Sequence, residues 1–319
     1  MSLPFVSIII IGHNEEKRLA QSIESALHSF YPAHKKEIIY VDCNSTDRSL
    51  QIAKKYPIKI VSTENETLPP GAARNVGARI SQGEVLHFLD GDMILERDWI
   101  LKAIKAFRND QQIACVFGKL QEMDPEKNVF NKLLNLHFAL QPAGEYPSPA
   151  GGGTYRREAF DQAGGFDENL HSGEEIDMGY RLRRLGYRIV CLDTCMALHD
   201  ADFHGFKHFW NRAFRDGKAE TLILRRCRNL KEILSRDYIL KTDAQLFLAT
   251  GFTAAAIAFK AFQILPVLIF LPVTLILRKS IQYNKHISNW KLSVLSAFFL
   301  YFNKLPMFLG HIYQTLSKR

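Results

Sequence analysis

The chain has 319 residues, of which 47% are hydrophobic and 23% are charged, and its formal net charge is +8. The length allows two domains, each with a core of ordinary size. From Ala201 onward there are 18 Lys and Arg against 6 Asp and Glu, so this part carries +12 and residues 1–200 carry −4. Because the basic part also holds the long apolar runs, the composition favours anionic lipid as a partner and excludes nucleic acid.

The cysteines form an odd, scattered set with no CxxC spacing: Cys43, Cys115, Cys191, Cys195 and Cys227. This pattern is typical of reduced thiols and not of a disulfide framework or a zinc site. The first ten residues, MSLPFVSIII, have no charged segment before their apolar run, so we expect no secretory signal.

From Phe5 to about Gly118, short apolar runs alternate with helical periods. The predicted strands, all rich in Ile, Val or aromatic residues, are 6–11, 37–41, 58–61, 84–89 and 113–117. Between the first two, Leu19, Ile23, Leu27 and Phe30 recur at helical spacing and predict a face toward the sheet. Strands that alternate with helices predict an α/β fold with a mainly parallel sheet.

The pattern loosens from Gln121 to about Ala150. A helix is predicted over 129–140, and the segment PAGEYPSPAGGG (residues 142–153) predicts a mobile surface loop. Loops in this position often cover an active site. Regular structure resumes with a helix in GEEIDMGYRLRRLG (173–186) and a strand in YRIVCL (187–192).

After His199 the chain becomes basic, aromatic and then apolar. Phe203, Phe206, Trp210 and Phe214 follow a helical spacing among basic residues, which favours a membrane interface over a core-facing helix. Residues 244–277 would form a helix of about 50 Å, longer than the ~30 Å hydrocarbon layer, so a two-segment hairpin or a kinked helix is expected. With 292–313 as a further candidate, the number of spans stays open. The predicted domains are 1–200, 201–243 and 244–319.

The segment Asp90-Gly91-Asp92 ends a buried strand, at the carboxyl edge where open α/β sheets bind ligands. Two carboxylates hinged by a glycine suit a divalent cation that also holds phosphate oxygens. The alternative is a plain turn, because Asp-Gly is a common turn dipeptide.

Further polar residues are expected at or near the same edge. They follow the first strand, end the second strand, lie on the helix that starts near Gly71, open the helix at 174, or follow the last strand: Asn14, Glu15, Asp42, Arg74, Asn75, Glu174, Glu175, Asp177 and His199. Several have a simpler explanation, since Asn14 and the acidic residues are also good helix starters.

Six segments, SIIIIGHNEE, VDCNSTDRS, GAARNVGA, FLDGD, GGFDE and GEEIDMGYRL, occur in one order over nearly two hundred residues. In this set and order the chain resembles the family 2 glycosyltransferases, which are inverting enzymes with the GT-A fold. The apolar tail is similar to that of many bacterial members.

The resemblance implies a role for each residue. Asn14, Glu15, Asp42, Arg74, Asn75, Asp90 and Gly91 would bind the nucleotide sugar, and Asp92 would hold Mg²⁺ or Mn²⁺, with His199 as a further candidate ligand. Glu175 would be the general base, although Asp is commoner at its position, and Glu174 and Asp177 are alternatives. Where the family usually has Asp and Gly after Asp42, this chain has Cys43 and Asn44. Asn44 can adopt the left-handed backbone of a glycine, so the turn can survive.

The function implied is transfer of a sugar from a UDP- or GDP-sugar to an acceptor hydroxyl, on a lipid-linked or cell-envelope glycan. A polyprenyl phosphate acceptor and a non-catalytic membrane scaffold are the alternatives. A dehydrogenase is disfavoured because no GxGxxG follows the first strand. Since activated sugars are cytosolic, the catalytic domain is expected on the cytoplasmic face of the inner membrane.

Overall fold

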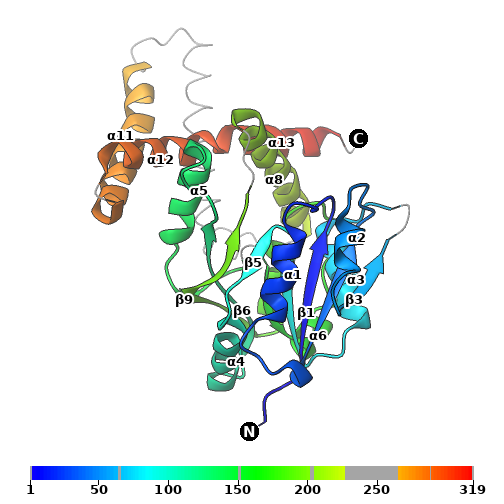
Figure 1. The fold of residues 1–319 in the computed structure, drawn as a ribbon. Helices are drawn as coiled ribbons and strands as arrows, with labels where there is room; N and C mark the ends of the chain where they lie inside the picture. The colour runs from blue at the N-terminus through cyan, green and yellow to red at the C-terminus, as the bar shows by residue number, and fades with distance from the viewer. Residues whose placement is uncertain are drawn as a thin grey trace. The chain divides into compact units, whose positions relative to one another are not determined.

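The computed structural model describes residues 2–63, 66–149, 152–201, 205–226, 265–287 and 289–317 (Figure 1). The chain forms two compact units, Met1–Asp202 and Phe203–Arg319, and each is described by itself. The site expected from the sequence lies in the first unit. The boundary falls where the sequence changes from an alternating strand and helix pattern to a basic and apolar one.

The first unit is built on one sheet of nine strands in the order β3-β2-β1-β4-β8-β6-β9-β5, with β7 also paired to β9. The strands are β1 (Val6–Gly12), β2 (Lys36–Asp42), β3 (Lys59–Ser62), β4 (Val85–Asp90), β5 (Met93–Leu95), β6 (Ile113–Glu122), β7 (Gly144–Glu145), β8 (Gly153–Arg156) and β9 (Arg188–His199). Its helices are α1 (Leu19–Leu27), the short 3-10 helix η1 (Ala33–Lys35), α2 (Ser49–Ala53), α3 (Pro70–Ile80), α4 (Trp99–Asn109), α5 (Val129–Ala139), α6 (Arg157–Gln162) and α7 (Glu174–Arg184).

The sheet is mixed. Strands β3, β2, β1 and β4 are parallel, as expected, but β8 is antiparallel to both of its neighbours and β5 and β7 are antiparallel to β9. The prediction of a mainly parallel sheet therefore holds for the first half and for the β6 and β9 pair. The antiparallel strands escaped prediction because they have two to four residues and no period.

The position of β1 creates the candidate site. It lies between β2 and β4, and its register pairs Gly12 with Asp42 on one side and Ile11 with Asp90 on the other. The chain thus goes outward to β2 and β3 and then returns past β1 to β4. With right-handed crossovers such a reversal puts α1 and α3 on opposite faces, and in open α/β sheets ligands bind beside this point, at the carboxyl ends of the strands.

Close packing of the helices holds this edge in place. Leu19 and Ile23 of α1 are fully buried, and Gly77 of α3 lies so close to β1 that an added Cβ would be 2.3 Å from Ile9 Cγ2. The expectation that Phe30 continues the buried face of α1 is wrong, because the helix ends at Leu27 and Phe30 is 58% exposed. Its ring instead lies near the guanidinium of Arg97.

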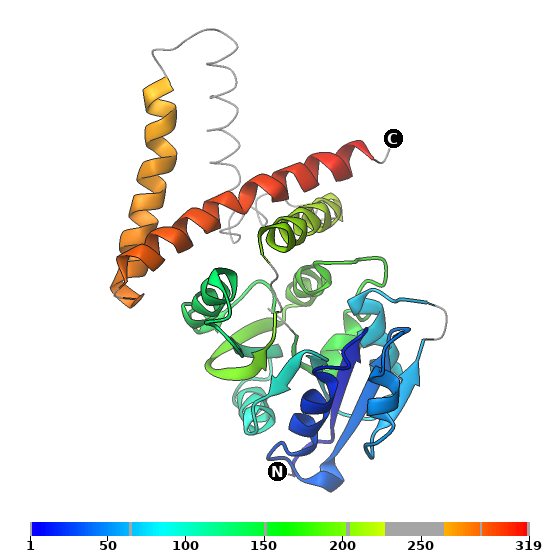
Figure 2. The same cartoon turned by 45° about the horizontal axis from the view of Figure 1, so that its top comes forward.

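The second unit contains α8 (Phe206–Arg226), α11 (Leu265–Ile287), α12 (Trp290–Phe302) and α13 (Lys304–Leu316). Helices α12 and α13 follow each other almost without a break (red in Figure 2). Among the described residues, the 27-residue stretch Trp290–Leu316 is the one helix long and apolar enough, by length and composition, to cross a membrane. Phe203 and residues 244–264 of the apolar stretch expected above lie outside the described residues.

Candidate functional site

The loop after β1 is fixed by side chains that bind its backbone. Asn14 has a φ of 60°, and its Oδ1 accepts hydrogen bonds from the backbone N–H groups of Thr46 (2.8 Å) and Asp47 (3.4 Å). The N–H of Asn14 in turn donates to Ser45 Oγ at 2.9 Å. Asn14 therefore joins the loops after β1 and β2, and its amide oxygen is engaged in that link.

Glu15 lies at the centre of the edge. Its side chain packs against Gly91, where an added Cβ would be 3.0 Å from Glu15 Cγ, so Gly91 is the residue type that leaves room for it. Burial and the charge of Asp92 raise the pKa of Glu15 to about 7, although Arg18 opposes the shift. A carboxyl group in this state can donate a hydrogen bond as well as accept one, as contacts to nucleoside hydroxyls require.

Asp42 is positioned by its surroundings at the end of β2. Only 1% of the residue is exposed, and its carboxylate accepts from the Tyr40 hydroxyl (3.0 Å) and the Ser45 N–H (3.1 Å). Asn44 has a φ of 58°, so it does adopt the left-handed conformation that a glycine would supply. The turn survives this departure from the family pattern.

Arg74 connects the end of β4 to the start of α7. Its side chain is 3% exposed and binds Asp90 Oδ1 (Nη2, 2.9 Å) and Glu174 Oε1 (Nη1, 2.6 Å), while Glu175 Oε1 lies 3.7 Å from Nη1. Burial alone would lower the pKa of Arg74, but the three carboxylates raise it. The guanidinium thus stays charged and ties α3, the end of β4 and the start of α7 together.

The two adjacent glutamates, Glu174 and Glu175, differ in their exposure and in their hydrogen-bond partners. Glu174 is 6% exposed and held directly by Arg74, whereas Glu175 is 20% exposed and accepts from the Gly152 N–H at 3.1 Å. Burial and the charge of Glu174 raise the pKa of Glu175 to about 7, with Arg74 opposing. A partly accessible carboxylate that titrates near neutral pH suits a general base, so the geometry favours Glu175 over Glu174.

Asp177 is paired with a residue of its own helix. Its Oδ2 accepts from Arg181 Nε (2.8 Å) and lies 2.7 Å from Arg181 Nη2, and Arg181 also donates to the carbonyl of Gly165 at 2.6 Å. The carboxylate therefore anchors the turn at 163–165 to α7, and the structure favours this role over that of a base.

We expect Asp177→Asn to lower the free energy of unfolding by about 1–3 kcal/mol, because a buried charge-assisted hydrogen bond is lost. Sugar transfer by the folded variant should stay near the wild-type rate. Urea unfolding and an initial-rate assay would check both expectations. A stable Asp177→Asn protein that has lost transfer would return Asp177 to the catalytic candidates.

Asn75, next to Arg74, uses its amide within the protein. Its Nδ2 donates to the Phe166 carbonyl (2.8 Å) and to Glu168 (3.0 Å), and its Oδ1 accepts from the Phe166 N–H (2.9 Å). Asn75 thus holds the GGFDE segment against α3, and Phe166 lies beneath the Arg74 guanidinium at 5.5 Å. In the structure, Asn75 therefore fixes the position of Phe166, which contacts Arg74.

Asp92 and His199 come together at the end of β9. His199 Nε2 is 3.5 Å from Asp92 Oδ2, while Asp92 Oδ1 is buried and has no hydrogen-bond partner among the described residues. A buried carboxylate oxygen of this kind fits the ligand set of Mg²⁺ or Mn²⁺. Within the described ranges no three His, Cys, Asp or Glu side chains form a metal cluster, and Asp90 is turned toward Arg74. A cation here would need further oxygen ligands, which water or a bound diphosphate can supply.

Sequence reasoning missed three charged residues beside this pair. Arg18 Nε donates to Asp200 Oδ2 at 2.6 Å and links the β1 loop to the end of β9. Glu122, the register partner of His199, is 1% exposed, accepts from Asn131 Nδ2 at 3.1 Å, and has a pKa raised by burial. Asp200 directly follows His199 in the sequence, and this position was the one indication that it belongs to the site. No such indication exists for Glu122, because the predicted strand 113–117 ends before it whereas β6 continues to Glu122.

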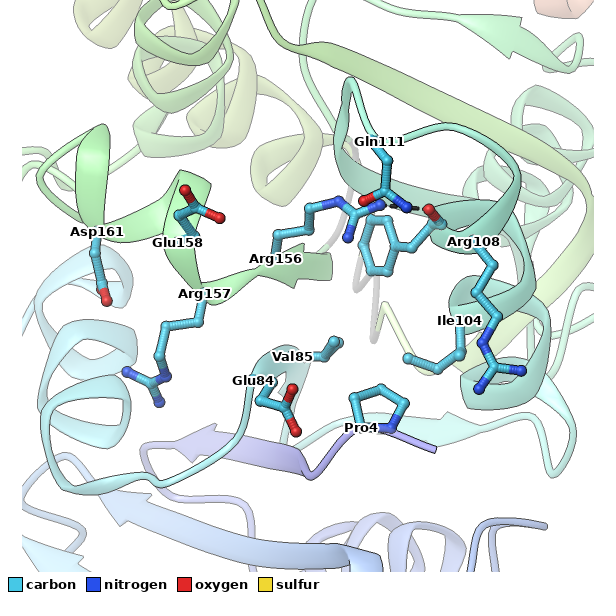
Figure 3. A pocket seen from close by; sticks show the side chains of 11 residues that line it. Pro4, Glu84, Val85, Ile104, Arg108, Gln111, Arg156, Arg157, Glu158 and Asp161 are labelled. Carbon is cyan, nitrogen blue, oxygen red and sulfur yellow. Dashed lines mark hydrogen bonds between the residues drawn. The ribbon is translucent and has the colours of Figure 1, made fainter. Parts of the chain in front are cut away.

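A pocket of about 530 Å³ lies at the opposite end of β4, where Val85 begins the strand, and none of the candidate residues lines it (Figure 3). Its arginines are used for structure. Arg156 donates to the carbonyls of Ile113 and Asp110, and Arg157 to that of Ser81. Asp42 and Asp90 lie at the other edge of the sheet, where β2 and β4 end.

Comparisons with known proteins identify the family. Residues 7–163 match the model of a family described as glycosyl transferase family 2. The chain is 27% identical over 204 residues to a probable glycosyltransferase, YdaM, of Bacillus subtilis, covering 59% of this chain and 48% of that protein. It is also 27% identical over 206 residues to a beta-monoglucosyldiacylglycerol synthase of Nostoc, covering 60% and 44%. The chain thus spans about half the length of these two relatives.

Among solved structures, mannosyltransferase PcManGT from Pyrobaculum calidifontis, in complex with GDP-Man and Mn²⁺, has a TM-score of 0.64. The likeness covers 99% of this chain and 88% of that one at 17% sequence identity. At this identity it concerns the fold alone, and it confirms the α/β architecture of the GT-A kind.

Proposed function

Because residues 7–163 place this chain in glycosyl transferase family 2, we propose that it moves a sugar from a nucleoside diphosphate sugar to an acceptor hydroxyl, with inversion at the anomeric carbon. One observation carries the proposal: Arg74 joins Asp90 at the donor edge to Glu174 and Glu175 on α7. This brings a donor-binding edge and a candidate base into one crevice.

The nucleoside would lie along Glu15 and Asp42, and the sugar near Asp90. Asp92, with His199 as the further candidate, would hold Mg²⁺ or Mn²⁺, which when bound neutralises charge on the leaving diphosphate. Glu175 would accept the proton of the acceptor hydroxyl, and the resulting oxygen nucleophile attacks the anomeric carbon opposite the diphosphate. The charge of Arg74 favours ionised Glu175, while the Gly152 N–H orients its Oε1.

The acceptor is proposed to be a lipid-linked or envelope glycan. The Nostoc relative is named as a synthase of a glycolipid, and the basic, apolar second unit favours a membrane location with the first unit on the cytoplasmic face. A phosphate acceptor, such as a polyprenyl phosphate, is the second candidate, and it would need no strong base. Replacement of Glu175 tested with both acceptor types separates the two.

A panel of UDP- and GDP-sugars, with and without Mg²⁺ or Mn²⁺, tests the donor. We expect one donor to raise the melting temperature of the detergent-solubilised protein, since a ligand that binds the native state stabilises it. For Asp92→Asn we expect the metal-dependent part of this shift to vanish, and transfer to fall about a hundredfold or more, because a cation is worth several kcal/mol at the transition state.

The exposed Asp98→Asn is the matched control and should behave as wild type, since Asp98 pairs with Lys102 at the surface. No shift with any donor and either metal would favour a non-catalytic scaffold. Full metal-dependent turnover by Asp92→Asn would overturn the proposed ligand.

A further inference from the structure

Helix α13 in the second unit has two unlike faces. Leu305, Leu309, Ile312 and Leu316 are spaced by four, three and four residues, so they form one stripe along the helix. They are 39–63% exposed, and Phe298 continues the stripe two turns earlier in α12 at 44%. We call these five residues the apolar stripe.

The opposite face packs on α8 with backbone contact. An added Cβ at Gly217 would be 2.0 Å from the Met307 carbonyl oxygen, and one at Gly310 would be 2.2 Å from that of Phe214. His311 completes the contact, with Nδ1 at 2.7 Å from Thr221 Oγ1 and Nε2 at 3.1 Å from Glu220 Oε2. Helices α8 and α13 therefore form one closely packed pair, and separating them would break these contacts.

Helix α8 is unsuited to the hydrocarbon layer. It carries Lys207, Arg212 and Arg215 exposed to solvent, together with Asp216, Lys218 and Glu220. A helix that spans the membrane at α13 would draw these charges into lipid, and would itself place Lys304 near the middle of the span. Both are costly. The stretch Trp290–Leu316 is also about 40 Å long, against a hydrocarbon layer of about 30 Å.

We propose that Trp290–Leu316 does not cross the membrane but lies in the plane of its surface, with the apolar stripe among the acyl chains and α8 on the water side. The partner is a bilayer with anionic headgroups, because Arg278, Lys285 and Lys291 are exposed and the sequence holds no Asp or Glu after Asp243. The inference rests on the proposed membrane location and is independent of the proposed sugar transfer.

Depth measurement by spin labelling tests the proposal. Single cysteines at Phe298, Leu305, Ile312 and Leu316 are introduced into the full chain with its five native cysteines replaced by serine, after thermal unfolding shows that this background is folded. The labelled proteins are bound to vesicles of phosphatidylcholine and phosphatidylglycerol. Collision with oxygen and with a water-soluble nickel complex then reports the depth of each label.

An in-plane helix should give the same shallow depth at all four positions, about 5–10 Å into the lipid, and a label at Thr315, which is exposed and lies off the stripe, should stay outside it. A profile that is deepest near Leu305 and shallow at both ends would overturn the proposal in favour of a span. Labels that all contact water, or that broaden one another as in a second copy, would also overturn it.

Partition to the same vesicles adds a second measurement. Leu309→Glu should weaken binding about tenfold, whereas Thr315→Glu, which adds the same charge to the exposed side of α13 away from the stripe, should change it little. Equal losses in the two variants would count against the stripe. If the wild-type chain does not float with vesicles at all, the membrane location itself fails, and the sugar-transfer proposal is unaffected.

Discussion

Glu175→Gln is expected to lower the rate of sugar transfer to a hydroxyl acceptor by about 10²–10⁴-fold, because a general base contributes that much to the rate. Binding of the nucleotide sugar should persist, since glutamine keeps the size of the side chain and can still accept from the Gly152 N–H. Glu175→Asp should keep measurable activity, as aspartate is common at this position in the family. Rates and donor affinity measured on one preparation separate the two effects.

The pH dependence sharpens this test. Since the pKa of Glu175 is raised from 4.5 to about 7, transfer by the wild type should fall as the pH drops below about 7, and this step should vanish in Glu175→Gln. If the step persists in the variant, it belongs to Glu15, whose pKa is also about 7. Because the pKa of Glu175 is higher in the native state than in the unfolded state, the free energy of unfolding should fall as the pH rises from 4.5 through 7 and the side chain ionises. Glu175→Gln should therefore be at least as stable as the wild type at neutral pH.

The donor edge was predictable because parallel strands leave a clear record in the sequence. Apolar runs that stop at Gly12, Asp42 and Asp90 mark three strand ends, and the rule that ligands bind at such ends brings them together without any structure. The register of β1 with β2 and β4 places Asp42 and Asp90 on either side of one strand, a strand order that the sequence did not specify.

The direction in which neighbouring side chains point was harder to predict. Arg74 and Asn75 are adjacent in α3, but successive helix residues are rotated by about 100°, so Arg74 reaches the strand edge while Asn75 turns to Phe166. For Asp177 a signal was available, because Asp and Arg four residues apart on a helix commonly pair, and Arg181 stands at that spacing.

The second half of the sheet could not be derived from periodicity. Strands β5, β7 and β8 have two to four residues, and β8 follows directly on a glycine run that reads as loop. Pairing with strands distant in the sequence decides their structure, as β8 shows by lying between β4 and β6. Gly152, whose N–H donates to Glu175, directly precedes β8 and was missed for the same reason. Glu122 was missed because β6 continues beyond the predicted strand 113–117.

Arg74 carries the largest structural consequence. It is one buried guanidinium among Asp90, Glu174 and Glu175, so its removal leaves carboxylates in a poorly solvated crevice without a counter-charge. We expect Arg74→Met to lower the free energy of unfolding by about 3–5 kcal/mol and to abolish transfer. Arg79→Met on the same helix is the matched control, because Arg79 forms an exposed pair with Glu168; it should change stability by less than about 1 kcal/mol.

The double variant Arg74→Met with Glu174→Met distinguishes packing from chemistry. An apolar pair of similar volume can replace a buried ion pair without loss of stability, so the double variant should recover most of the stability lost in Arg74→Met, as measured by urea unfolding. Transfer and donor binding should stay low, since no cation then links Asp90 to Glu175. If both stability and transfer return, Arg74 serves only to neutralise Glu174. If neither returns, the crevice depends on the shape of the guanidinium and not on the balance of charge.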